Sequence, residues 1–180
     1  MRLKTFSPSD VAGKKVLVRV DFNVPLAGGR VSDDTRIKAH LPTLTALREA
    51  GAKIALVSHL GRPKGTVNLK YTLEPVGEEL AKLTGWPVRF VSDCIGEKVD
   101  EAVADWKDGE VLLLENVRFH PEEEKNDMEF AKKLVKNFDV FVMDAFSAAH
   151  RAHASTRAAA ELIPSFSGKL IDREITMLSA

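Results

Sequence analysis

The chain has 180 residues, a length typical of about one domain and large enough to bury a sizeable core. Its 26 lysines and arginines balance 26 aspartates and glutamates, which argues against a protein that binds nucleic acid through bulk positive charge. Charged residues make up 29% of the chain and apolar residues 44%, which excludes a disordered protein. These sums do not show whether positive charge is concentrated locally, and that question decides the function.

Short apolar runs alternate with helical patterns along the chain. The runs predict strands at residues 15–20, 53–58, 88–91, 111–114 and 139–143. Several of them are almost continuously apolar, as strands are when both faces of a sheet are buried.

Helical periodicity fills the gaps between these strands. Apolar stripes predict helices near residues 37–47, 73–83, 99–106, 128–135 and 171–178. Pro42 lies inside the first stripe and predicts a kink or a helix in two parts, and Gly28 with Gly29 predicts a turn. The alternation of strand and helix predicts an α/β fold in three layers: a doubly wound, mostly parallel, Rossmann-like sheet with helices on both faces.

No apolar run reaches the ~20 residues that a membrane-spanning helix needs, and the first residues lack the apolar core of a signal peptide. The single cysteine, Cys94, excludes an internal disulfide and is expected to be a small buried thiol. We therefore expect a cytoplasmic protein in a reducing compartment.

Basic residues follow the predicted strands where each one ends. In open α/β sheets, ligands bind outside the carboxyl ends of the strands, so these loops share one edge. The basic candidates there are His59, Arg62, Arg118 and Arg151. Guanidinium groups match phosphate oxygens in bidentate geometry, which favours a shared site for a small, multiply charged anion such as a phosphate ester. Taken singly, each arginine is better explained by a surface ion pair or a solvated side chain.

Arg36 follows Asp33, Asp34 and Thr35, a cluster that predicts the N-cap of a helix. A cation in the first turn opposes the helix dipole. Its place there points to a functional role, because Arg36 and the helix N-terminus would together attract an anion. The alternative is an ion pair with Asp33 or Asp34.

Asp21 and Asn23 follow the first predicted strand and offer a carboxylate and an amide for a ligand hydroxyl. The alternative is an Asx turn that ends the strand. Residues 122–124, all glutamate, are expected to form a solvated acidic loop. His40 and His120 carry no clear signal.

Several nucleotide and metal motifs are missing from the sequence. Neither G-x-x-x-x-G-K-[ST] nor G-x-G-x-x-G occurs, which disfavours a P-loop protein and a Rossmann dehydrogenase. No H-E-x-x-H segment and no paired cysteines occur either, so no metal site is expected.

Taken together, these segments resemble the N-terminal domain of the phosphoglycerate kinase family. In chain order the segments that carry the resemblance read VRVDFNVP, DDTRI, SHLGRPKG, LENVRF, EEEKND, DAF and AHRAHAS. The resemblance implies a two-domain cytosolic enzyme of glycolysis. Such an enzyme moves a phosphoryl group between 1,3-bisphosphoglycerate and ADP, giving 3-phosphoglycerate and ATP.

The resemblance also implies roles for the matching positions. Asp21 and Asn23 would hold the hydroxyl side of the substrate, and Arg36 would contact its carboxylate end and stabilise the transferring group as the catalytic residue. The non-transferring phosphate would fall to His59, Arg62, Arg118 and Arg151. The full substrate-binding set implied is Asp21, Phe22, Asn23, Arg36, His59, Leu60, Gly61, Arg62, Arg118 and Arg151.

The sequence departs from the family in two ways. Where the family usually reads Asn-Asp-Ala-Phe-Gly, this chain has Met143 for the polar residue and Ser147 for the glycine, which bears on the loop that carries Arg151. The family's nucleotide-binding C-terminal half, which takes Mg-ADP or Mg-ATP, has no counterpart here. We therefore expect residues 1–165 to form the substrate-binding domain and residues 166–180 to begin an interdomain helix, with no cofactor or metal bound by this chain.

Two hypotheses from different classes follow. On the first, the chain is the N-terminal half of a phosphoglycerate kinase that binds phosphoglycerate but does not turn over alone, because domain closure completes such sites. Its partners are the small-molecule substrate and the missing C-terminal domain, with no nucleic acid and no membrane. On the second, the chain is an isolated or engineered fragment with a folding or association role and no substrate binding. A third, a general anion-binding α/β module, predicts equal affinity for sulfate and 3-phosphoglycerate.

Overall fold

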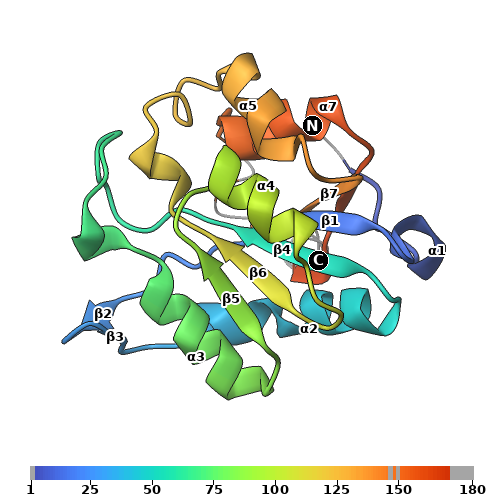
Figure 1. The fold of residues 1–180 in the computed structure, drawn as a ribbon, viewed down its shortest axis with the longest axis horizontal. Coiled ribbons are helices and arrows are strands. Elements are labelled where there is room, and N and C mark those ends of the chain that lie inside the picture. The colour runs from blue at the N-terminus through green and yellow to red at the C-terminus, as the bar shows by residue number, and fades with distance from the viewer. Residues whose placement is uncertain (1–2, 146–147, 149–150, 171–180) are drawn as a thin grey trace, which may run out of the picture.

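A six-stranded parallel sheet runs through the centre of the molecule in the computed structural model, which describes residues 3–145, 148 and 151–170 (Figure 1). Its strands are β1 (Lys15–Arg19), β4 (Lys53–Val57), β5 (Val88–Val91), β6 (Val111–Leu114), β7 (Val140–Met143) and β8 (Ser165–Ser167). Their spatial order is β5-β6-β4-β1-β7-β8, and every neighbouring pair is parallel. The five strands expected from apolar runs are confirmed. β8 escapes the sequence analysis because serines occupy two of its three positions.

Helices cover both faces of this sheet (Figure 1). On one face lie α2 (Thr35–Glu49) and α3 (Glu74–Thr84), and on the other lie α4 (Glu97–Ala104), α5 (Met128–Val135) and α7 (Ala159–Leu162). The predicted three-layer α/β architecture is therefore confirmed. The smaller elements are α1 (Pro8–Val11), β2 (Leu26–Ala27), β3 (Arg30–Val31), η1 (Leu69–Tyr71), η2 (Val117–Phe119) and the π-helical η3 (Ala154–Ala158).

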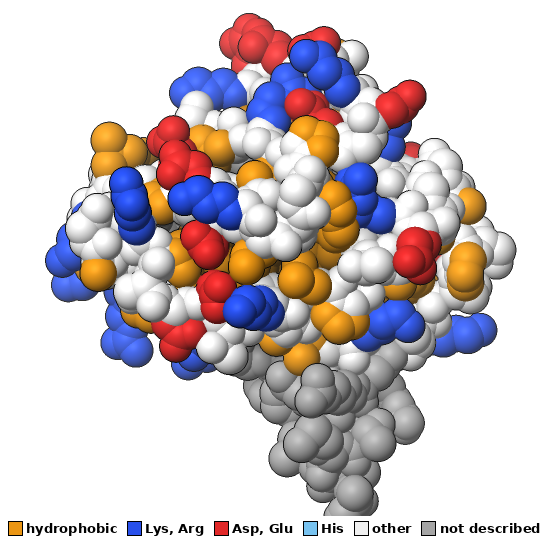
Figure 2. Space-filling model, turned by 90° about the horizontal axis from the view of Figure 1, so that it is seen from below, with side chains coloured by type: hydrophobic (Ala, Val, Ile, Leu, Met, Phe, Trp, Pro, Cys, Tyr) orange, Lys and Arg blue, Asp and Glu red, His pale blue; other side chains and the backbone are white. Residues whose placement is uncertain are grey.

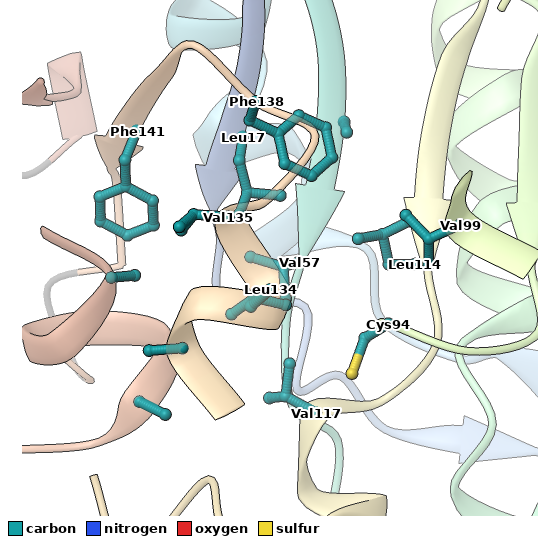
Figure 3. Close-up of a cluster of buried hydrophobic side chains, with 14 of the residues drawn as sticks. Leu17, Val57, Cys94, Val99, Leu114, Val117, Leu134, Val135, Phe138 and Phe141 are labelled. Carbon is teal, nitrogen blue, oxygen red and sulfur yellow. The ribbon is translucent and has the colours of Figure 1, made fainter. Parts of the chain in front are cut away.

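Successive residues of a strand point alternately into two separate hydrophobic cores. Leu17 and Val57 pack with α4, α5 and α7, as Figure 3 shows for part of this cluster. Val16, Val18 and Leu56 face the other way and pack with α2 and α3. Both sides of the inner strands β1, β4, β6 and β7 are thus removed from water, which explains why the sequence shows continuous apolar runs there rather than alternation.

The surface carries charged side chains among apolar ones. On the face that carries α2 and α3, Figure 2 shows basic side chains interspersed with acidic ones. Within the described ranges, no helix combines the length and apolar character needed to cross a bilayer.

α2 runs without interruption from Thr35 to Glu49 although it contains Pro42. The expectation of a helix in two parts is wrong. Proline removes one backbone donor and clashes with the preceding turn. That cost is offset because Ile37, Leu44 and Leu47 are fully buried against the sheet.

The turn predicted at Gly28 and Gly29 is confirmed. It joins β2 to β3 in an antiparallel hairpin, and the two glycines have φ angles of +58° and +75°. Such angles favour glycine because it lacks a Cβ.

The C-terminal end of the described chain belongs to the sheet. The boundary expected after residue 165 falls inside β8, where Phe166 lies opposite Val142 of β7, so the sheet extends to Ser167. The helix predicted at residues 171–178 lies outside the described residues. The division between a substrate domain and an interdomain helix stays a prediction.

Candidate functional site

A cavity of about 270 Å³ opens where the strands of the parallel sheet end. The residues that line it are Asp21, Asn23, Arg36, His59, Gly61, Arg62, Arg118, Ala148 and Arg151. They follow β1, β4, β6 and β7 or begin α2, so the topology of the sheet brings them together. All but Ala148 belong to the set named from the sequence. Their role in binding stays a prediction.

Phe22 and Leu60 belong to the expected set but do not line the cavity. They are 0% and 4% exposed. The Phe22 N–H donates to Ser58 Oγ over 2.9 Å, and the Leu60 carbonyl accepts from Asn116 Nδ2 over 2.7 Å. Both residues therefore help to fix the strand-end loops, and their role in substrate binding stays a prediction.

Gly61 joins three strand ends. Its N–H donates to Asn23 Oδ1 over 2.9 Å, and its carbonyl accepts from Arg118 Nη1 over 3.2 Å. Its φ is +61°, and a Cβ at this position would overlap the ring of Tyr71. Only glycine meets both constraints without strain.

Arg36 points back toward the end of β1. Its Nη1 donates to the Asn23 carbonyl over 2.8 Å and lies 3.4 Å from Asp21 Oδ1. The ion pair of Arg36 is therefore with Asp21, not with Asp33 or Asp34 as the alternative held. The Asx turn is present as well, because Asp21 Oδ1 accepts from the Asn23 N–H over 3.1 Å. The Arg36 side chain is 54% exposed, so it remains open to a ligand.

His40 lies beneath Asp21 and is 1% exposed. Its Nε2 is 3.0 Å from the Asp21 backbone N–H, which can only donate, so Nδ1 carries the proton and donates to Asp144 Oδ2 over 2.7 Å. Thr43 Oγ1 and the Leu170 N–H both donate to Asp144 Oδ1. This network ties α2 to the ends of β1 and β7. The sequence offers a weak signal for it, since residues four apart share a helix face and His40 follows Arg36.

His59 is held as a neutral imidazole. Arg19 Nη2 lies 2.8 Å from His59 Nδ1, and a guanidinium only donates, so Nδ1 accepts and the proton sits on Nε2. Burial first, then the positive charges of Arg19 and Arg118, lower the pKa of His59 to about 2. The interpretation of His59 as a fourth cation is therefore wrong. It presents a neutral N–H donor.

Arg19 itself is fully buried and linked to an acid through a hydroxyl. Its Nε donates to Ser155 Oγ over 2.9 Å, and Ser155 in turn donates to Glu123 through both its hydroxyl and its N–H. Glu123 is 0% exposed, so the expectation of a solvated acidic loop is wrong at that residue. A detectable signal exists in the sequence: Arg19 is a cation inside an apolar strand, where unpaired charge is costly.

Arg118 is the buried cation of the cavity, at 7% exposed. Its Nε is also buried and finds no acceptor within the part of the chain that the structure describes. Burial lowers the pKa of Arg118, but a guanidinium keeps its proton in proteins. A buried donor without a partner favours an anionic acceptor brought by a ligand.

Of the two residues that depart from the family pattern, only Met143 lies within the described residues. Met143 is 3% exposed and packs in the apolar cluster that contains Leu17. Ser147 lies outside the described residues. The metal-ligating side chains that cluster within the described ranges, Asp93, Cys94 and His120, are not among the cavity-lining residues.

Comparison with known proteins gives matches along nearly the whole chain. The family model described as phosphoglycerate kinase matches residues 6–180. The phosphoglycerate kinase of Borrelia garinii subspecies bavariensis is 57% identical over 175 residues, which are 97% of this chain and 44% of the relative. That of Caulobacter vibrioides is 56% identical over 180 residues, which are 100% of this chain and 46% of the relative.

Solved structures agree with these matches. Phosphoglycerate kinase from Pyrococcus horikoshii superposes with a TM-score of 0.88 at 36% identity, covering 98% of this chain and 45% of that one. The enzyme from Coxiella burnetii gives a TM-score of 0.83 at 34% identity, with coverages of 99% and 44%. This chain thus spans less than half the length of each of these relatives. Sequence and fold together show that it belongs to the phosphoglycerate kinase family.

Proposed function

We propose that this chain forms the half of a cytoplasmic phosphoglycerate kinase that binds 3-phosphoglycerate and 1,3-bisphosphoglycerate. The observation that carries the proposal is the convergence of Arg36, Arg62, Arg118 and Arg151 on one cavity of about 270 Å³, in a chain with no net charge. Such a local concentration of guanidinium groups attracts a small, multiply charged phosphate ester.

The non-transferring phosphate would lie among Arg62, Arg118 and Arg151, with His59 as a neutral donor. Arg118 offers the buried Nε for which the described residues hold no acceptor. The His59 Nε2–H adds a hydrogen bond without adding charge, and this matters because Arg19 and Arg118 already repel a further cation at that place.

The other end of the substrate would meet Arg36, Asp21 and Asn23. Asn23 Oδ1 is engaged by Gly61, which leaves the amide nitrogen as its group for a ligand hydroxyl. Arg36 lies in the first turn of the 15-residue α2, so the carboxylate end of the substrate would meet its guanidinium and the positive end of the helix dipole together.

Phosphoryl transfer requires chiefly positioning and charge neutralisation. In this proposal the P–O bond to the substrate carboxylate breaks, ADP accepts the phosphoryl group, and Arg36 neutralises the charge that develops. A bound Mg-nucleotide would supply the acceptor. Asp93, Cys94 and His120 do not fit Mg²⁺, which prefers oxygen ligands. The resemblance to the family implies that the nucleotide would bind to the half of the enzyme that this chain does not span, so the chain alone would bind substrate without turnover.

Calorimetric titration of the chain with 3-phosphoglycerate tests the proposal, with sulfate as the matched anion. We expect saturable binding that is tighter than sulfate binding, and loss of that binding when Arg62, Arg118 and Arg151 are all replaced by alanine. A folded chain without detectable binding would favour the association fragment, and equal affinities would favour a general anion module. Substantial turnover by this chain with ADP, Mg²⁺ and 1,3-bisphosphoglycerate would refute its inactivity.

A further inference from the structure

Asp93, Cys94 and His120 form a cluster apart from the residues that line the basic pocket. Asp93 and Cys94 lie between β5 and α4, and His120 directly follows η2. One carboxylate oxygen, the cysteine sulfur and one ring nitrogen all lie within 4.8 Å of one another. We propose that these three side chains bind a borderline-soft divalent cation of the Zn²⁺ type, with water as the fourth ligand.

The donor set selects the class of metal. Zinc takes sulfur, imidazole nitrogen and carboxylate oxygen in tetrahedral sites, whereas Mg²⁺ and Ca²⁺ prefer oxygen alone. Bond lengths of about 2.0–2.3 Å place tetrahedral zinc ligands roughly 3.3–3.7 Å apart. The three donor atoms lie within 4.8 Å of one another. A contraction on the order of 1 Å at the wider pairs, with a slight opening of the 2.9 Å contact between Asp93 Oδ1 and His120 Nε2, would complete the site.

The carboxylate ligand is already oriented by the backbone. Asp93 Oδ1 accepts from the Cys94 N–H over 2.7 Å and lies 3.4 Å from the Ile95 N–H. The His120 ring packs on Phe130 with their centroids 5.2 Å apart. Partners of this kind fix the direction of metal ligands and stabilise the bound metal.

The electrostatic surroundings favour a cation at the sulfur. The carboxylates of Asp93, Glu123 and Glu115 all lie close enough to the Cys94 thiol to act on it electrostatically. The same three carboxylates give the site a negative potential, which attracts a divalent ion.

The cluster also has an entry path. Cys94 is 1% exposed, whereas the side chains of His120 and Asp93 are 28% and 38% exposed. Figure 3 shows the Cys94 sulfur turned away from Val99 and Leu114 toward the segment that carries Val117. The sulfur is therefore the buried ligand, and the two polar ligands are partly accessible to the water that would complete the coordination.

Binding requires a defined exchange of protons. Asp93 Oδ1 and His120 Nε2 are now 2.9 Å apart in a hydrogen bond. When the metal binds, the Cys94 thiol gives its proton to solvent. A neutral His120 that carries its proton on Nε2 loses that proton to solvent and takes up another on Nδ1. Nε2 is then free to bind the metal. One proton is released overall, and metal affinity therefore rises with pH.

Cobalt titration tests the proposal, because Co²⁺ occupies zinc sites and reports sulfur ligation by a charge-transfer band in the near ultraviolet. The full chain is titrated with Co²⁺ in the absence of any phosphate ester. We expect the band to saturate at one equivalent, to strengthen with pH and to be displaced by Zn²⁺ but not by Mg²⁺. Absence of the band would overturn the proposal.

Variants identify the ligands. Cys94→Ala removes the band. His120→Gln and Asp93→Asn each weaken Co²⁺ binding by on the order of 100-fold. Losses up to this size occur even when only a hydrogen-bonding partner of a metal ligand is removed. Asp105→Asn is the matched control, since Asp105 is an exposed carboxylate that also pairs with a basic side chain, Arg89. Asp105→Asn should leave the Co²⁺ affinity unchanged. Because His120 is partly exposed, His120→Gln remains decisive even if Cys94→Ala does not fold, and unchanged binding in His120→Gln would refute the site.

Discussion

The floor and the rim of the basic pocket hold their polar groups in different ways. The floor consists of His59 and Arg118, which line the pocket, together with Arg19, which bonds to His59 behind it; all three are buried. The rim consists of Arg36, Arg62 and Arg151, all exposed. Floor residues are linked to the protein by hydrogen bonds that fix even the tautomer of His59. The rim side chains are exposed to solvent, although Arg36 also bonds to the end of β1.

Because of this difference in burial, substitutions in the floor and in the rim should affect folding and binding differently. A buried charge is costly unless it is compensated, and Arg19 is compensated through Ser155 and Glu123. Changes to the floor should therefore lower stability together with binding. Changes to the rim should lower binding alone, because exposed side chains contribute little to folding.

The largest effect on stability is expected from a substitution of Arg19. Arg19→Met removes the donor to His59 Nδ1 and leaves Glu123 buried without its cation, so we expect the free energy of unfolding to fall by about 3–5 kcal/mol. Urea denaturation measures this loss. Arg62→Met is the matched control on the rim and should change stability by no more than about 0.5 kcal/mol. Equal losses in the two variants would remove the distinction between floor and rim.

Gly61 connects the two regions, since it bonds to Arg118 and precedes Arg62. Gly61→Ala adds positive-φ strain and an overlap with Tyr71, for which we expect a stability loss of about 2–4 kcal/mol. Gly13→Ala is the control, because Gly13 has a φ of +69° but no atom within 4 Å of its Cβ position. It should lose only the strain, about 1–2 kcal/mol. Similar losses at both sites would show that the Tyr71 contact relaxes freely.

The rim has a smaller effect, confined to binding. Arg62→Ala should weaken 3-phosphoglycerate binding by about 10–100-fold, as expected for a charged hydrogen bond worth about 1.5–3 kcal/mol, with stability unchanged. Titration calorimetry and urea denaturation measure the two quantities. Arg30→Ala, at an exposed arginine in β3, should alter neither. A stability loss in Arg62→Ala comparable to that of Arg19→Met would contradict the role of the rim.

The sequence predicts the rim better than the floor, and the reason is physical. Parallel strands share one carboxyl edge, so rim residues that follow different strands, such as Arg62 and Arg151, could be placed together without coordinates. The state of His59 depends on Arg19, which lies on another strand and contacts it only after folding. Glu123 lies in a run of polar residues, and that local sequence does not reveal that Glu123 becomes buried and bonded to Ser155 after folding. Asp93 and His120 likewise meet only through the fold.

The smallest effect concerns the protonation of the floor. His59 stays neutral in the folded protein because its pKa is about 2, whereas in the unfolded chain it titrates near its ordinary value of about 6.5. Below about pH 6.5 the unfolded state therefore binds more protons, and stability falls as the pH decreases. Between about pH 7.5 and 5 this amounts to about 2 kcal/mol.

His59→Gln isolates that contribution. Its side-chain oxygen can still accept from Arg19, but it cannot take up a proton, so the variant should lose about 2 kcal/mol less than the original chain over the same pH range. Burial also lowers the pKa of His153, which acts in the same direction in both proteins and cancels in the comparison. If the two unfolding free energies fall in parallel with pH, His59 is protonated in the folded state. His59 would then add a further positive charge to the floor beside Arg19 and Arg118, and its assignment as a neutral donor would be wrong.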